Sequence, residues 1–184
     1  AHPRRREDGL PHGDVPRLRA PHPPRLIHYS LIVQFNMKKI IGLYGLPNTG
    51  KTTTLKRLIG LFGEKVNGEK PVTIDDYRGK KIVIAPGGDT LGVVKANVKT
   101  FKEEKADILV SATRTKGGSQ DALKEHAKKI GTDVIWVGKN HSASLHSLIN
   151  ETQAKELYDF IDLIIDKWEE QSEDNSSSSD PVTE

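Results

Sequence analysis

The chain has 184 residues, no cysteine, and 28 basic against 25 acidic residues, which gives a formal net charge of +3. The lack of cysteine excludes disulfide bonds, thiolate catalysis and cysteine-ligated metals, and it fits a reducing, cytoplasmic setting. The basic excess does not support a nucleic-acid partner. It matches the excess of residues 1–36, where six arginines stand against three acidic residues, and no nucleic-acid-binding module is visible.

The two ends of the chain differ in composition from the part between them. Residues 1–36 hold six of the ten prolines and four of the seven histidines, which predicts a disordered extension. Met37 is the only methionine and stands directly before the first apolar strand, so we expect it to be the natural start, with residues 1–36 upstream of it. Residues 169–184 are acidic and serine-rich and predict a disordered tail. The expected folded domain is therefore residues 37–168, and no membrane segment is expected.

Short apolar runs alternate with helical patterns along this domain. Strands are predicted at 40–44, 71–74, 81–85, 107–111 and 133–137, with a turn at 75–80. Helices are predicted at 53–62, 90–105, 119–130 and 150–168, with Ser119 and Asn150 as N-caps. Nearly all-apolar strands that alternate with helices predict an α/β fold. We expect a three-layer sandwich in which helices cover both faces of a mostly parallel sheet of about five strands.

Residues 45–52 read Gly-Leu-Pro-Asn-Thr-Gly-Lys-Thr, the pattern G-x-x-x-x-G-K-[ST], between the first predicted strand and helix. Gly45 and Gly50 let the backbone wrap closely around a phosphate chain, and the following helix N-terminus supplies positive potential. Lys51 can reach the β- and γ-phosphates, and the Thr52 hydroxyl can ligate Mg²⁺. The alternative is a glycine-rich turn that merely closes a strand–helix unit.

Through this motif and its flanks the chain resembles the P-loop NTPase superfamily. The resemblance implies a three-layer P-loop fold that binds a nucleoside triphosphate, ATP or GTP, with Mg²⁺. The residues that it places on the nucleotide are Gly45, Pro47, Asn48, Thr49, Gly50, Lys51, Thr52 and Thr53.

Two further loops should meet this one, because ligands of parallel sheets bind where the strands end. Asp89 follows the strand 81–85, which we expect next to the phosphate-loop strand, so it could hold Mg²⁺ or orient water; the alternative is that Asp89 or Thr90 caps the next helix. Arg114 and Lys116 could stabilise a transferring phosphoryl group, or they could form a solvated basic loop. The expected catalytic residues are Lys51, Asp89 and Arg114, and the expected metal ligands are Thr52 and Asp89.

A second acidic position is the pair Asp75 and Asp76. It could hold Mg²⁺ or deprotonate an acceptor hydroxyl, but we favour a turn with local hydrogen bonds. Arg78 has the same two interpretations as Arg114, with the structural one favoured. Trp136 alternates within a strand and is expected in the core.

The histidines outside residues 1–36 lack the spacing of a metal site. His126 lies on a predicted helix and is expected to be exposed. His141 and His146 lie in a polar loop near a strand end, where they could contact a substrate.

Three functions stay open at this stage. The first is an NTPase that switches or drives a protein partner, the second a small kinase with a nucleotide or metabolite acceptor, and the third a nucleotide-sensing module. A GTPase is less favoured, because the run 138–141 does not match the base-reading N/T-K-x-D motif and no D-x-x-G follows the strand 81–85. The Gly87-Gly88 turn and the pair at 75–76 resemble the shikimate-kinase-like branch, but too few residues separate them for its substrate-binding insert. The oligomeric state is not predicted.

Overall fold

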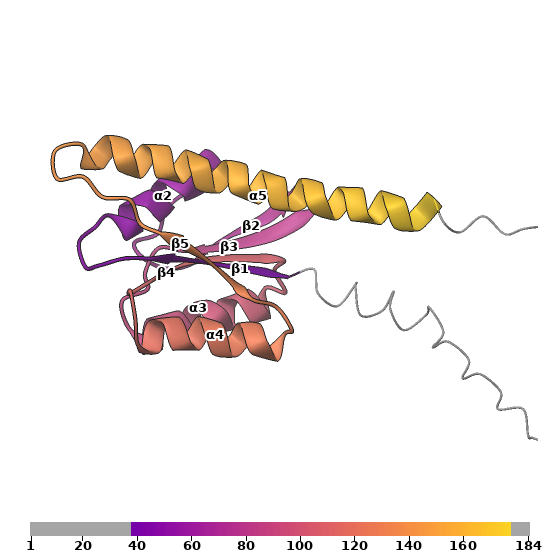
Figure 1. Cartoon of the computed structure of the whole chain (residues 1–184), viewed down its shortest axis with the longest axis horizontal. Coiled ribbons are helices and arrows are strands. Elements are labelled where there is room, and N and C mark those ends of the chain that lie inside the picture. Colours follow the sequence, from indigo (N-terminus) through magenta and orange to yellow (C-terminus); the bar gives the residue numbers. More distant parts are fainter. Residues whose placement is uncertain (1–37, 178–184) are drawn as a thin grey trace, which may run out of the picture.

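The computed structural model describes residues 38–177, which form one five-stranded sheet with helices on both faces (Figure 1). The expected fold class is confirmed. The elements in chain order are β1 (Lys39–Tyr44), α2 (Lys51–Leu61), β2 (Val72–Tyr77), β3 (Lys80–Ala85), α3 (Leu91–Glu103), β4 (Ile108–Thr113), α4 (Gly118–Lys129), β5 (Val134–Gly138) and α5 (His146–Ser177). The predicted extension 1–36 and the proposed start at Met37 lie outside the described residues.

The strand order is β2-β3-β4-β1-β5. Strands β1, β3, β4 and β5 run parallel, and β2 is antiparallel to β3 at one edge. The loops after β1, β3, β4 and β5 therefore leave the sheet at one end, which we call the carboxyl end. One expectation is wrong: β3 is not the neighbour of β1, because β4 lies between them.

Strands β1, β3 and β4 bury side chains on both faces, which explains the nearly continuous apolar runs of these strands in the sequence. Ile41 and Leu43 face α2 and α5, where they pack with Leu55. Ile40 faces α3 and α4 and packs with Phe101. In Figure 1, α5 and α2 lie on one side of the sheet and α3 and α4 on the other. The sheet thus holds the strand ends in fixed positions between two packed helical layers.

The segment 75–80 is a strand and a tight hairpin rather than a loop. Strand β2 continues through Asp75 and Asp76 to Tyr77, and the chain reverses at Arg78 and Gly79, which have φ values of 54° and 71°. Two residues in the left-handed region match the twist of a two-residue hairpin. Because β2 runs antiparallel to β3, the end of β2 lies at the end of the sheet opposite to the carboxyl end.

Helix α5 differs from the prediction at both ends. It begins at His146 rather than after Asn150, and the backbone N–H of Ile149 already bonds to the Leu145 carbonyl. It also continues beyond Trp168 to Ser177, so residues 169–177 of the expected tail are helical. Residues 169–173 are mostly Glu and Gln, which favour helix, and Glu169 is bonded to Arg78.

The predicted cap of α4 is also wrong. The N-cap residue is Gly117, and Ser119 lies inside the helix, where its Oγ accepts a hydrogen bond from the Arg114 backbone N–H at 3.1 Å. None of the helices within residues 38–177 is long and apolar enough to cross a membrane.

Candidate functional site at the carboxyl end of the sheet

The loop Gly45–Thr52 joins the end of β1 to the start of α2. Gly50 is the N-cap of α2 with φ +88°, and no side chain caps the first turn of the helix. The first N–H groups of α2 therefore have no intrahelical or side-chain acceptor, which is the arrangement that attracts anions. Asn48 also has a positive φ of 59°, and the Thr49 hydroxyl donates to the Leu46 carbonyl at 2.9 Å, so the loop is held in a compact turn.

The side chain of Lys51 folds back across this loop and is only 5% exposed. Its ammonium donates to the carbonyls of Gly45 at 3.0 Å and Leu46 at 2.8 Å. Burial lowers the pKa of Lys51, while the charge of Asp89 opposes that shift and the charge of Arg114 adds to it. The lysine is thus placed over the loop as a partly desolvated cation.

The loop after β3 reaches the start of α2 although β3 and β1 are not neighbours. The Thr52 hydroxyl donates to the Pro86 carbonyl at 3.1 Å. Gly88 passes directly over the end of β4, where a Cβ on it would lie 1.7 Å from the carbonyl oxygen of Ala112. Only a glycine fits where the chain crosses the end of β4 at this position, and the crossing brings residues 86–90 to the loop 45–52.

A buried asparagine holds this second loop in place. Asn97 on α3 is almost fully buried, and its Nδ2 donates to the Gly87 carbonyl at 2.8 Å and to the Ser111 hydroxyl at 3.1 Å. The amide therefore connects the loop after β3 to strand β4.

Asp89 and Arg114 form an ion pair beside Lys51. Arg114 Nε lies 3.2 Å from Asp89 Oδ1, with side-chain exposures of 41% and 60%. Both charges influence the pKa of Lys51, so the three groups share one site. Asp89 is not the helix cap, because Thr90 accepts the hydrogen bond from the Val93 backbone N–H at 3.2 Å. Lys116, in contrast, is exposed in its loop.

A second lysine, which sequence reasoning missed, lies at this site. The backbone N–H of Lys139 bonds to the Tyr44 carbonyl at 2.8 Å, directly after β5, and a Cβ on Gly45 would lie 3.0 Å from Lys139 Cβ. Burial lowers the pKa of Lys139, and the nearby charge of Lys51 lowers it further. Its ammonium donates to the Asn140 carbonyl. The sequence feature that could have identified Lys139 is its position just after the predicted strand 133–137.

A pocket of about 360 Å³ adjoins the loop on its α5 side. His141 and His146 line it together with Asn48, Thr53 and Asn150. The two histidines therefore lie beside the loop 45–52, and a substrate contact by either of them stays a prediction.

The pair Asp75 and Asp76 lies away from this site, at the opposite end of the sheet. Asp75 forms an ion pair with Lys81 at 3.1 Å, and Asp76 accepts a hydrogen bond from the Gly79 backbone N–H at 2.8 Å. The favoured structural interpretation holds, although the residues belong to a strand.

Arg78 has a structural role as well. Its guanidinium contacts three carboxylates on α5 at 3.3, 2.6 and 2.7 Å. These belong to Asp162, Asp166 and Glu169. The contacts hold the β2–β3 hairpin against α5 and keep Arg78 away from the loop 45–52.

The expectation for His126 is wrong. It is 7% exposed, its ring packs edge-on against Phe101, and its Nε2 has no hydrogen-bond partner. His126 is buried because α3 packs against the face of α4 that carries it. Trp136 is partly buried in the core against Gly42, at the outer strand of the sheet.

Comparison with known proteins finds no matching family profile, no similar curated protein and no similar solved structure. Within residues 38–177, no three His, Cys, Asp or Glu side chains gather as a metal cluster. The Thr52 hydroxyl and the Asp89 carboxylate are among the side-chain oxygens near the loop.

Proposed function

We propose that this chain binds a nucleoside triphosphate, ATP or GTP, with Mg²⁺ at the loop 45–52 and hydrolyses it. The observation that carries the proposal is the uncapped N-terminus of α2 directly behind a glycine turn, with Lys51 folded over the same turn. Such a helix start offers free N–H donors and positive potential to phosphate oxygens.

The lysines provide the charge for the phosphate chain. Lys51 gives up its two carbonyl contacts and turns its ammonium to the β- and γ-phosphate oxygens. Lys139 approaches from the end of β5 and adds a second cation. Burial lowers the pKa values of both lysines because it removes water from their ammonium groups. A nearby anion stabilises the charged ammonium in place of that water, so a phosphate is a favoured partner.

Thr52 and Asp89 are the residues that would hold Mg²⁺. An ion that arrives with a triphosphate needs only one or two protein oxygens, and this pair supplies a hydroxyl and a carboxylate. When bound, Mg²⁺ neutralises charge on the phosphates. The Thr52 hydroxyl can offer a lone pair to the ion while its proton stays hydrogen-bonded to the Pro86 carbonyl, so that hydrogen bond would orient the oxygen.

In hydrolysis a water oxygen forms a bond to the terminal phosphorus while the bond to the leaving diphosphate breaks. The residues act by position and charge. Arg114 can stabilise the developing charge, and Asp89 can orient the attacking water, if the pair opens towards the phosphates. Asp89 is the only acid in the loops 45–52, 86–90 and 112–118.

Transfer to a small acceptor is the less favoured reaction. The acidic pair that could have activated an acceptor hydroxyl is bound to Lys81 and the Gly79 backbone at the far end of the sheet. Hydrolysis needs no residue that deprotonates an acceptor hydroxyl, so the loss of this acidic pair from the site favours water as the acceptor.

The test is to quantify nucleoside diphosphate and free phosphate together, from the full chain with Mg·ATP or Mg·GTP. Equal amounts of both products that vanish in Lys51→Ala support hydrolysis. Asp89→Asn should lower turnover roughly tenfold or more while nucleotide still binds, and Lys116→Ala is the matched control that leaves both unchanged. Binding without turnover would indicate a kinase that awaits its acceptor or a sensing module, and diphosphate that forms without free phosphate only after a candidate acceptor is added would indicate the kinase. Activity that survives Lys51→Ala would show that the site is elsewhere.

A further inference from the structure

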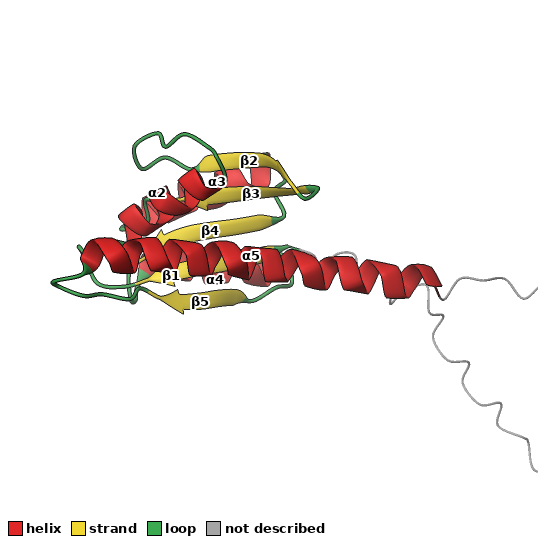
Figure 2. Ribbon diagram, turned by 90° about the horizontal axis from the view of Figure 1, so that it is seen from above, coloured by secondary structure: helices red, strands yellow, loops and turns green. Residues whose placement is uncertain are grey.

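The outer edge of β5 is open. No described strand lies beyond it in the order β2-β3-β4-β1-β5, and Figure 2 shows β5 as the last strand on its side of the sheet. The other edge strand, β2, carries Asp75 and Asp76 and an irregular register between Ile74 and Tyr77. Charges and irregularities of this kind discourage pairing at a sheet edge. Four of the five residues of β5 are apolar and partly buried, so this edge has no such protection.

The outward hydrogen-bonding groups of β5 can be assigned from its inner side. The backbone N–H of Lys139 points to β1, because it bonds to the Tyr44 carbonyl. Alternate residues of a strand point the same way, so Val137 and Ile135 also face β1. Val134 and Trp136 therefore present their N–H and C=O groups to the open side.

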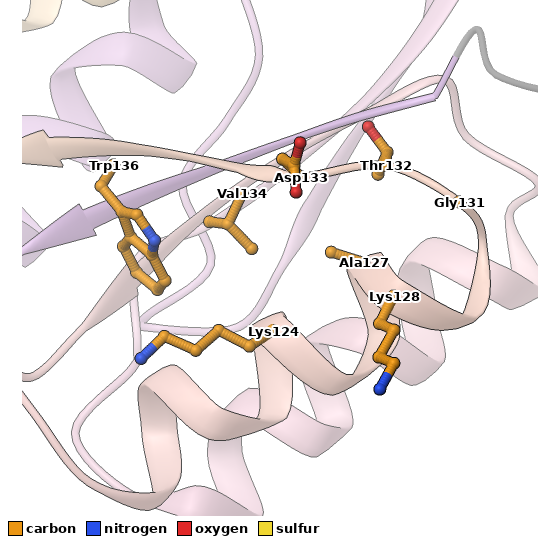
Figure 3. A pocket seen from close by; sticks show the side chains of 8 residues that line it. All are labelled: Lys124, Ala127, Lys128, Gly131, Thr132, Asp133, Val134 and Trp136. Carbon is orange, nitrogen blue, oxygen red and sulfur yellow. The ribbon is translucent and has the colours of Figure 1, made fainter.

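The open edge is flanked by a hollow on each face of the sheet. On the α4 side, a pocket of about 500 Å³ lies between the strand and the helix, with Val134 and Trp136 above it and Lys124 and Lys128 below (Figure 3). On the α5 side, an apolar pocket of about 220 Å³ is lined by Val137, Leu157 and Phe160 among others. An added strand would find room for side chains on both faces.

Helix α5 lies over the sheet, and part of one of its faces is next to β5. Glu156, Phe160, Leu163 and Lys167 are spaced by four, three and four residues, which places them on one stripe of the helix. Glu156 and Phe160 line the hollow beside β5, so the stripe faces the open side. Leu163, on the same stripe, is 52% exposed.

The stripes of two antiparallel copies of α5 are complementary to each other in hydrophobicity and charge. If two copies of α5 lie antiparallel about a point midway between Ile161 and Asp162, Phe160 meets Leu163 of the second copy. In the same arrangement Glu156 meets Lys167 of the second copy. Apolar side chains pair in the centre and opposite charges pair outside, as an interface with two-fold symmetry requires.

The two-fold axis that relates two copies of α5 would also pass through the middle of β5. Gln153 bonds to the Gly138 carbonyl at 2.7 Å and to the Asn140 backbone N–H at 3.0 Å, which fixes α5 against the end of β5. The helix midpoint lies about 13 Å further along α5, which corresponds to about four strand residues and so to the level of Ile135. Antiparallel β5 strands centred there pair Val134 with Trp136 of the second copy, the two residues with outward N–H groups.

We propose that this edge is the interface of a homodimer. Two β5 strands pair antiparallel about Ile135 and join the sheets, and the α5 stripes pack above them. The two carboxyl ends then point in opposite directions, so dimerisation needs no nucleotide. On the other face, Lys124 and Lys128 of both copies surround the hollow of Figure 3.

The experiment is sedimentation equilibrium of the full chain, without nucleotide, at concentrations up to about 100 μM, where an interface of ordinary size is occupied. Leu163→Glu should raise the dimer dissociation constant roughly a hundredfold. Glu156→Lys and Lys167→Glu should each raise it roughly tenfold, because each reversal removes two symmetric pairs and adds two repulsions. The double reversal should restore dimerisation, since the pairs re-form with exchanged signs.

Lys99→Glu on the exposed face of α3 is the matched charge reversal and should leave the dissociation constant unchanged. Circular dichroism confirms that each variant is folded, and Lys51→Ala should remain dimeric whatever its nucleotide binding. A monomer throughout this concentration range overturns the proposal. So does a dimer that ignores Leu163→Glu, or one that the double reversal fails to restore.

Discussion

The side-chain amide of Asn150 lies against Gly50, so close that a Cβ on the glycine would sit 2.5 Å from Asn150 Oδ1. The same oxygen accepts a hydrogen bond from the Thr54 hydroxyl at 3.3 Å, and Asn150 is buried. Gly50 is therefore required twice, by its φ of +88° and by this contact. Through Asn150, the second turn of α5 packs against the loop 45–52.

Asn150→Ala should destabilise the fold by about 1–2 kcal/mol, because the Thr54 hydroxyl loses a buried acceptor. Nucleotide affinity should fall as well, since the loop loses its support. Asn150→Asp keeps the accepting oxygen but places a negative charge beside the phosphates, so it should weaken nucleotide binding more than it weakens folding. Chemical denaturation and nucleotide titration of both variants make the comparison; unchanged stability in Asn150→Ala would contradict the role given to the contact.

The indole of Trp136 occupies the space in front of Gly42, where a Cβ would lie 2.5 Å from Cζ3 of the ring. Gly42→Ala should therefore cost about 1–3 kcal/mol of unfolding free energy, because the ring must move within a packed core. Replacing Trp136 with leucine should relieve much of that cost in the double variant. Gly60→Ala on α2, where nothing lies within 4 Å, is the matched control and should be neutral or slightly stabilising. Equal losses in the two glycine variants would exclude the steric explanation.

His126 predicts how stability depends on acid pH. Burial lowers its pKa below 6.5, and the charges of Lys102, Lys129 and Lys38 lower it further. The unfolded chain therefore binds a proton at a higher pH than the folded chain, so His126 makes stability fall as pH drops below about 6.5. His126→Leu should remove that part of the slope and cost little at neutral pH, because Nε2 has no partner to lose. Unfolding free energies measured between about pH 5 and 8 check this, with the exposed His146→Gln as control; an unchanged slope would contradict it.

The two lysines at the phosphate loop predict an alkaline limit to nucleotide binding. Burial lowers the pKa of Lys51 and of Lys139 from the usual 10.5. Affinity should therefore be constant near neutral pH and fall as pH rises through these lowered values, where the ammonium groups lose their protons. Lys139→Ala should weaken binding roughly tenfold at neutral pH, which corresponds to one charge-assisted contact. Titrations from about pH 7 to 10 test both statements, and an affinity that rises with pH would contradict them.

The sequence predicts the strands and helices of this fold well where burial is two-sided. The runs at 40–44, 81–85 and 107–111 are apolar because both faces of those strands are covered, and the glycine–lysine loop is visible because its chemistry is local. Strand β2 was cut short since its last residues lie on an exposed edge, where aspartates are tolerated and resemble a turn.

Sequence analysis did not place Lys139 and Asn150 at the site, because their positions depend on the order of the strands and the path of α5. Local sequence patterns do not predict either. Lys139 belongs to the candidate site only because β5 lies beside β1. Asn150 belongs to it only because α5 begins before this residue and packs against Gly50. The sequence argument for Asp89 assumes that β3 is the neighbour of β1, which is wrong. Asp89 reaches the site because Gly88 crosses the end of β4.

The most direct test of the account is calorimetric titration of Mg·ATP and Mg·GTP into the full chain, beside Lys51→Ala and the control Lys116→Ala. We predict saturable one-site binding of at least one nucleotide, with a dissociation constant on the order of micromolar. We also predict a loss of about a hundredfold or more in Lys51→Ala and none in Lys116→Ala. No binding of either nucleotide by the folded chain, or equal binding by Lys51→Ala, would contradict the proposed site.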